Sequence, residues 1–424
     1  MNAKNIADPD AMLRRAVSLY EAGQFERSES IYEKLIKSFP DDTTLLTDLG
    51  SLKLRLGKVK EGFKLIHRSL KIDPNQPTAY YNQAVCLEKH NKITEALTCY
   101  DQTIALNPDF SQAFFNKGLL KLLSGDFEEG WQLYEKRWAC SNQKILARNF
   151  TQPLWLGDQA LEGRTLLIHP EQGYGDFIQL CRYIPLLEAR GAKVVVETFA
   201  SLVPLLSTLK GNFTVVEHGK QLPAFDFHCP IMSLPLAFKS TVASIPANIP
   251  YLYADPGKQS EWGRRLGSKT KPRVGLVWSG SAAHQNDFQR SIPLKLLKPL
   301  WNTPVEFHVL QTEVRAHDAA ILAALNQVQT HQDDLHDFSD TAALVEQMDL
   351  VISVDTSLAH LAGALGKALW ILLPYSADYR WLRDRTDTPW YPSATLFRQP
   401  AIGDWTSVIR QIKKCLADVT GIET

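Results

Sequence analysis

The chain has 424 residues, of which 45% are hydrophobic and 22% are charged. Because a single hydrophobic core stops growing at roughly 250–300 residues, we expect two or three domains. The 46 basic residues balance 46 acidic residues, which argues against nucleic acid as a partner. The sequence contains no apolar run of about 18 residues and no apolar leader segment, so it predicts a cytoplasmic protein without a membrane span.

A 34-residue period marks the N-terminal part of the chain. Pro40, Pro74 and Pro108 are 34 residues apart, the period of tetratricopeptide repeats, in which each unit is a pair of helices. Three further positions keep this phase: a turn residue, a small residue facing the neighbouring helix, and a large apolar or aromatic residue. They are Gly23, Gly57, Asn91 and Gly125 at the turn, Ser28, Gly62, Ala96 and Gly130 at the small position, and Tyr32, Ile66, Tyr100 and Tyr134 at the large one. Glycine and asparagine suit the turn because they enter the left-handed backbone region at low cost.

This resemblance to tetratricopeptide repeats covers about residues 9–138, or about four units, and we assign residues 1–138 to the helical array. Stacked repeats bury apolar faces between neighbours and leave a concave groove. We expect the groove to bind a protein or a peptide. The alternative is an array that serves self-association, as in a homo-oligomer, or acts as a spacer.

After Trp138 the pattern changes to short β-branched runs that alternate with amphipathic helical stretches, which is typical of parallel βαβ units. The predicted strands fall into two sets. They are 165–170, 193–199, 213–218 and 226–230 in the first set, and 273–280, 306–312, 349–355 and 368–374 in the second. We therefore expect an α/β fold of two Rossmann-like halves, residues 161–255 and 273–424, with linkers at 139–160 and 256–272. Ligands of such sheets bind beyond the carboxyl ends of the strands.

The loop after the first predicted strand reads H-P-E-Q-G-Y-G-D and ends at Asp176, at the start of a helical pattern. Gln172, Gly173 and Gly175 make it a candidate active-site loop. It does not match the dinucleotide fingerprint, because Ile178 stands where a third glycine is needed. The G-A-L-G-K run at 363–367 does not match a P-loop either, because two residues separate its glycines instead of four.

A second candidate loop follows the strand at 349–355 and reads D-T-S-L-A-H. Thr356 or Ser357 can cap the helix that begins there, and the free N–H groups of a helix N-terminus form an anion site suited to a diphosphate. Asp355 precedes the cap, and His360, one turn into the helix, can donate to a phosphate or sugar oxygen. The alternative is that these residues only cap the helix and that His360 is a buried structural residue.

The two loops together resemble a known enzyme group. A G-x-G-D loop in the first half, paired with D-T-S-x-A-H-L-A-G-A-L-G in the second, is similar to the heptosyltransferase group (glycosyltransferase family 9) of GT-B glycosyltransferases over roughly residues 160–400. Fusion to a repeat array resembles the O-linked N-acetylglucosamine transferases. The segments at 278–280, 286–294, 373–382 and 389–393 resemble bacterial fusions of this kind. Ser357 stands where heptosyltransferases usually carry glycine, which argues against heptose itself as the sugar.

The resemblance implies roles for single residues. Asp176 matches the proposed general base, which removes the proton of the acceptor hydroxyl; its alternative role is a helix cap. Arg290 can stabilise the leaving diphosphate as a fixed planar cation, or it is a surface arginine. The remaining implied contacts are with the donor or the sugar. They are Trp278, Ser279 and Gly280 near the donor, Gln311 at the nucleobase or ribose, and Trp381, Trp390 and Tyr391 stacked on a sugar or packed in the core.

No metal or other cofactor is expected. The α/β part contains no Asp-x-Asp motif, and the six cysteines form no C-x-x-C pair, which favours buried thiols over a zinc site or disulfides. The sequence thus predicts an inverting, metal-independent glycosyltransferase that moves a sugar from a nucleotide-sugar to a hydroxyl of a protein recruited by the repeats. The alternatives are a saccharide- or lipid-directed transferase whose repeats serve assembly, and a non-catalytic scaffold.

Overall fold

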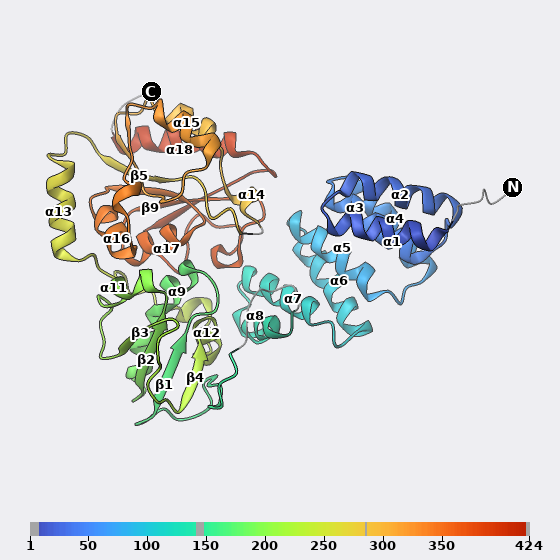
Figure 1. The fold of residues 1–424 in the computed structure, drawn as a ribbon, viewed down its shortest axis with the longest axis horizontal. Helices are drawn as coiled ribbons and strands as arrows, with labels where there is room; N and C mark the ends of the chain where they lie inside the picture. The colour runs from blue at the N-terminus through green and yellow to red at the C-terminus, as the bar shows by residue number, and fades with distance from the viewer. Residues whose placement is uncertain (1–7, 141–147, 285, 421–424) are drawn as a thin grey trace. The chain divides into compact units, whose positions relative to one another are not determined.

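The computed structural model describes residues 8–140, 148–284 and 286–420 (Figure 1). These residues form two compact units. The first unit ends at Leu120 and the second begins at Lys121, except that Ala139 and Cys140 group with the first.

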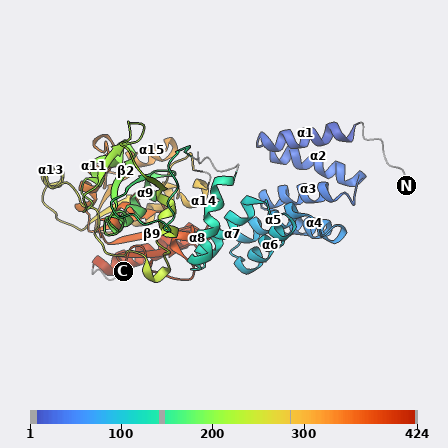
Figure 2. The ribbon, with the colours of Figure 1, turned by 90° about the horizontal axis from the view of Figure 1, so that it is seen from below.

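The first unit is a stack of antiparallel helix pairs (Figure 2). Its helices are α1 (Pro9–Glu21), α2 (Phe25–Ser38), α3 (Thr43–Arg55), α4 (Val59–Ile72), α5 (Pro77–Lys89), α6 (Ile93–Leu106) and most of α7 (Ser111–Leu123). The positions predicted from the 34-residue period are confirmed. The turn residues Gly23, Gly57, Asn91 and Gly125 have φ angles of 72°, 76°, 57° and 84°.

The small positions allow neighbouring helices to approach closely. A Cβ atom on Gly62 would lie 2.8 Å from the backbone oxygen of Gly50, so a larger residue would force α3 and α4 apart. Ser28 is fully buried and donates a hydrogen bond of 2.7 Å to the backbone oxygen of Ala16. The large residue of each of the first three repeats is at most 4% exposed. The 34-residue period therefore reflects the packing of the helices against one another.

The second unit contains two parallel sheets. The strands of the first sheet are β1 (Thr165–His169), β2 (Lys193–Thr198), β3 (Thr214–Glu217) and β4 (Phe227–Pro230). Their order is β3-β2-β1-β4. The chain runs outward from β1 to β3 and then returns to the other side of β1, so the strand order reverses between β1 and β4.

The second sheet is larger and reverses in the same way. Its strands are β5 (Arg273–Val277), β6 (Glu306–Val309), β7 (Val328–Gln329), β8 (Leu350–Val354), β9 (Leu369–Leu373) and β10 (Ala394–Arg398). Their order is β10-β9-β8-β5-β6-β7, with every pair parallel. The reversal lies between β5 and β8. The sequence did not predict the short strand β7 or the last strand β10.

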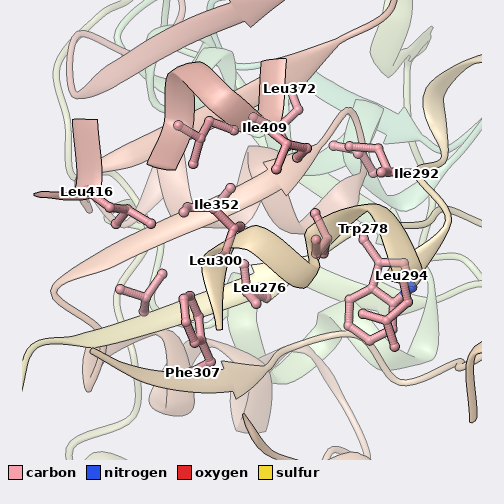
Figure 3. Packing of buried hydrophobic residues seen from close by; sticks show 14 of the residues in the cluster. Leu276, Trp278, Ile292, Leu294, Leu300, Phe307, Ile352, Leu372, Ile409 and Leu416 are labelled. Atoms are coloured by element: carbon pink, nitrogen blue, oxygen red, sulfur yellow. The ribbon is translucent and has the colours of Figure 1, made fainter. Parts of the chain in front are cut away.

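Helices connect the strands of both sheets. They are α9 (Tyr174–Leu180), α10 (Ile184–Glu188), α11 (Val203–Leu206), α12 (Leu234–Ala237), α13 (Pro256–Leu266), α14 (Asp287–Arg290), α15 (Ala316–Ala323), α16 (Phe338–Glu346), α17 (Ser357–Ala364) and α18 (Trp405–Thr420). Side chains from β5, β6 and β8 pack against α18 and the 3-10 helix Leu294–Leu300 to form the core of the second half (Figure 3). Leu276, Phe307 and Ile352 belong to this core and are at most 2% exposed.

Two predicted boundaries differ in the structure. The expected linker 256–272 contains α13, whose start is capped by Asp255 and Pro256 and whose end is set by Gly267 at φ 67°. Helix α13 has few apolar residues, and of them only Trp262 is buried. The end of the expected repeat array, residues 121–138, groups with the α/β unit. This segment comprises the end of α7, α8 (Phe127–Tyr134) and most of the 3-10 helix η1 (Glu135–Ala139).

The described part of the expected linker 139–160 is also structured. Leu154 forms an isolated parallel bridge with His228 of β4, and Trp155 is fully buried beside that edge of the first sheet. The backbone N–H of Trp155 donates to the oxygen of His228 at 2.8 Å. Residues 141–147 lie outside the described residues. Residues 153–155 therefore add to the first sheet at its β4 edge.

Candidate functional site

The predicted donor residues follow β5 and β8, the two strands between which the second sheet reverses. Parallel sheets bind ligands at this position because the loops after the two strands diverge and leave a crevice. Trp278, Ser279 and Gly280 follow β5, and Asp355, Thr356 and Ser357 follow β8. The structure brings the loops after β5 and β8 to one edge of the second sheet.

Gln311 and Trp278 hold the ends of β5 and β6 together. The Gln311 side-chain oxygen accepts from the Trp278 backbone N–H at 3.1 Å, and its amide nitrogen donates to Ser279 Oγ at 3.1 Å and to the Glu313 oxygen at 2.7 Å. The Trp278 indole N–H donates to Asp318 Oδ2 at 2.9 Å, and its ring is 1% exposed. The polar groups of both side chains therefore bind protein atoms.

Arg290 spans the two loops. Its Nη1 donates to the backbone oxygen of Asp355 at 2.8 Å. A Cβ atom on Gly280 would lie 2.7 Å from the Arg290 Cζ, so the guanidinium lies directly against the β5 loop. Asp287 accepts from Arg290 Nε at 3.4 Å and also pairs with Arg315. A fixed cation therefore stands where the strand order reverses.

Gly175 explains how the two halves meet. A Cβ atom at this position would lie 2.8 Å from Cδ2 of His360 and 3.2 Å from Cα of Ser357. The first turns of α9 and α17 thus touch, backbone against backbone, and only glycine fits between them. This contact places Asp176 of the first half beside the D-T-S loop of the second.

Asp176 uses both carboxylate oxygens. Oδ2 accepts from the Gly173 backbone N–H at 2.7 Å and caps α9, while Oδ1 accepts from Arg380 Nη2 at 2.5 Å. The helix-cap role is therefore present. Since each carboxylate oxygen has two lone pairs, each can still accept one more hydrogen bond, and the general-base role stays a prediction.

Arg380 is the residue that the sequence analysis missed. It is 8% exposed and also donates from Nε to Gln179 Oε1 at 2.9 Å and from Nη1 to Asp378 Oδ1 at 2.8 Å. Burial acts against the charge of this guanidinium, but Asp378, Tyr379 and Asp176 raise its pKa above the usual range. Its position within the resembling segment 373–382 was the only signal, because no local pattern links it to a partner 204 residues away.

Thr356 does not cap α17 with its side chain, and the donor contact expected of Asp355 stays a prediction. Burial, and then the nearby charge of Asp378, raise the pKa of Asp355 to about 6, although Arg380 and Arg290 act in the opposite direction. Thr356 occupies the N-cap position of α17, but its hydroxyl lies 3.2 Å from Ser353 Oγ and does not cap the helix. The first backbone N–H groups of α17 are consequently not used by that side chain.

His360 is a buried neutral imidazole. Burial, and then Arg380, Arg182 and Arg290, lower its pKa well below the usual value, so it carries no charge at neutral pH. Its Nδ1 lies 2.9 Å from the Tyr391 hydroxyl, and its ring stacks on Trp381 at 5.4 Å. Trp381, Trp390 and Tyr391 are at most 1% exposed, which makes them core residues and leaves no ring face for a sugar.

Gln172 turns away from this cluster. Its amide nitrogen donates to the Tyr134 hydroxyl of α8 at 2.8 Å. No group of three or more His, Cys, Asp or Glu residues that could hold a metal ion occurs among the residues that the structure describes. Within the same residues, no helix is long and apolar enough to cross a membrane.

These features define a tetratricopeptide-repeat protein with a parallel-sheet α/β unit. Residues 10–42 and 77–110 each match the family described as tetratricopeptide repeat. Over 95% of its length the chain is similar to Protein FlbA of Caulobacter vibrioides, at 25% identity and covering 72% of that protein. The TPR repeat-containing protein YpiA of Bacillus subtilis is 26% identical over 40% of this chain and 37% of its own. A crystal structure of MamA is 20% identical over 31% of this chain and 72% of its own, with a TM-score of 0.28.

Proposed function

We propose that the α/β unit is an inverting, metal-independent GT-B glycosyltransferase. The observation that supports this best is the meeting of the two resembling motifs, which are about 180 residues apart in sequence. Gly175 of the first motif contacts His360 and Ser357 of the second, and Asp176 pairs with Arg380. A degenerate scaffold would not require a carboxylate of the first half to meet guanidiniums and a helix N-terminus of the second half.

The chemistry follows from the charges at this edge. The acceptor hydroxyl attacks the anomeric carbon, the bond from that carbon to the diphosphate oxygen breaks, and the hydroxyl proton passes to the Asp176 carboxylate. The leaving nucleoside diphosphate gains negative charge as the bond breaks. Arg290 and the first backbone N–H groups of α17 would stabilise that charge because both are already fixed before the reaction.

The repeats fit the recruitment of a protein acceptor. Tetratricopeptide repeats form extended concave surfaces that bind polypeptides, and a tethered acceptor reaches the site at a high effective concentration. The alternative is a saccharide or lipid acceptor, with the repeats binding an assembly partner. Comparing transfer to protein, saccharide and lipid hydroxyls from one active donor separates the two.

The nucleotide can be identified by thermal unfolding with UDP-, ADP-, GDP- and CMP-sugars. A ligand at about 100 times its dissociation constant stabilises the folded protein by about 2.7 kcal/mol. We expect one nucleotide series to raise the unfolding temperature of the wild type and to have a much smaller effect on Arg290→Ala. Arg264→Ala, on exposed α13, is the control and should respond as the wild type does. If no nucleotide-sugar stabilises the wild type, the glycosyltransferase proposal is wrong.

A further inference from the structure

Helix α8 and η1 continue the repeat period but pack into the second unit through one face. The Arg137 side chain of η1 is fully buried, and its Nε and Nη2 donate to the two oxygens of Glu171 at 2.7 and 3.0 Å. It also donates to Ser233 Oγ at 2.7 Å, to Glu135 Oε1 at 2.6 Å and to the Tyr134 backbone oxygen at 3.5 Å. Glu171 begins the loop that leads to Asp176. A bidentate pair between a planar guanidinium and a carboxylate fixes direction as well as distance.

Tyr134 of α8 holds the same loop at the next residue. Its hydroxyl accepts the 2.8 Å hydrogen bond from Gln172. Two consecutive residues of the loop, Glu171 and Gln172, are thus tied to consecutive elements of the former repeat segment. The loop is further fixed from the first half, because Glu171 also accepts from the Met232 backbone N–H at 3.0 Å.

The same helix packs on the segment that carries Arg380. The rings of Trp131 and Tyr134 lie 5.8 and 6.0 Å from the ring of Tyr379, the residue before Arg380. Phe127 stacks at 6.4 Å on Trp390, the residue before Tyr391. Helix α8 therefore contacts the loop of Asp176 on one side and the segment 379–391 on the other.

We propose that α8 and η1 are positioning elements of the candidate site, and that Tyr134 and Arg137 hold the loop 171–176 in the register that pairs Asp176 with Arg380. This inference deepens the proposed function, on which it rests for the role of the pair. Tyr134 and Arg137 touch no ligand in this scheme and act through the loop. The helix that completes the last repeat is then part of the enzyme.

The test uses the full chain and three variants. Tyr134→Phe keeps the ring and removes the hydroxyl that Gln172 binds, and Arg137→Lys keeps the charge and removes the bidentate geometry. Tyr100→Phe is the matched control, because Tyr100 holds the same phase in the preceding repeat and binds Glu88 in the first unit. Amide hydrogen exchange is measured over 171–180, over 379–391 and over β5 and β6.

Tyr134→Phe and Arg137→Lys are expected to raise exchange in 171–180 about tenfold and to leave β5 and β6 unchanged, whereas Tyr100→Phe changes neither region. In a donor assay kcat should fall about tenfold with little change in KM, since the base is displaced and the donor site is not. Wild-type exchange in 171–180 for both variants would overturn the proposal. So would an equal rise over the whole second unit, which is the signature of general destabilisation. If no donor binds, the proposed function fails, but the exchange data still decide the positioning role.

Discussion

Asp355 should make the folded protein less stable at neutral pH than an uncharged residue would. Its pKa rises from the ordinary 3.8 to about 6 in the folded state. One pKa unit corresponds to about 1.4 kcal/mol, so the ionised carboxylate costs the folded state about 3 kcal/mol at pH 8, to order of magnitude. Because the folded state holds this proton more tightly than the unfolded state does, stability falls as the pH rises from about 4 to about 6.

The perturbation is Asp355→Asn, which keeps the shape and removes the charge. We expect the variant to unfold at higher urea concentration than the wild type at pH 8, with a gain of about 1–3 kcal/mol in the free energy of unfolding. At pH 5 the gain should be about half as large, since part of the wild-type carboxylate is protonated in the folded state by then. The same variant should lose affinity for the nucleotide-sugar. In that case Asp355 lowers the stability of the fold but is needed for binding the donor.

Asp349, just before the other end of the same strand β8, is the matched control. Burial acts against its ionisation, but hydrogen bonds from Lys269 and the Arg273 backbone N–H lower its pKa below the ordinary value. A lowered pKa stabilises the fold above the unfolded pKa, so Asp349→Asn should lose stability at pH 8, the opposite sign. If Asp355→Asn is less stable than the wild type at pH 8, or gains as much at pH 5, the burial argument is refuted.

Four further outcomes are expected. Gly175→Ala should destabilise the second unit by about 1–3 kcal/mol, because its Cβ meets the α17 backbone. The control Gly263→Ala, in exposed α13, should stabilise the protein by up to about 1 kcal/mol. Equal urea midpoints of unfolding for the two variants would contradict this. Asp176→Asn should lower turnover by about 10²–10⁴-fold and leave the affinity for the donor unchanged. Adding Arg380→Gln to this variant should not restore turnover. Wild-type turnover in Asp176→Asn would exclude Asp176 as the base. Transfer should persist in EDTA, and loss that manganese restores would refute a metal-free reaction. Deleting residues 1–110 should leave donor hydrolysis intact and lower transfer to a protein acceptor, and undiminished transfer would favour the saccharide or lipid alternative.

The repeats could be predicted in detail because their determinants are local. The turn glycines, Asn91 and the small residues act within one helix pair, and the same contact recurs every 34 residues. Eight of the ten strands among the described residues were found for a similar reason, since buried parallel strands are continuous apolar runs. Strand β7 has two residues and carries no such run, and α13 buries little apart from Trp262, so neither gave a clear pattern.

The sequence predicted which loops form the candidate site, but not which side chains contact one another there. Position at the end of a strand suggested that Gln311 reads a ligand, yet its amide is occupied by the protein, and sequence cannot tell these two uses of a polar side chain apart. Arg380 lies opposite Asp176 only because two separate sheets are brought together. Pairing between halves has no period and leaves no trace in a single sequence.

Tyr134 shows what the repeat period can predict about a residue and what it cannot. Its phase with Tyr32 and Tyr100 identifies a helix of the repeat type, and in that sense the prediction is right. The period says which face of the helix is buried but not what buries it, and here the cover is Gln172 and Tyr379 of the α/β unit. A deletion meant to remove acceptor recruitment alone must therefore end before α7. Removing residues 1–138 would leave Glu171 as a buried carboxylate without its guanidinium, and the loss of activity that followed would say nothing about recruitment.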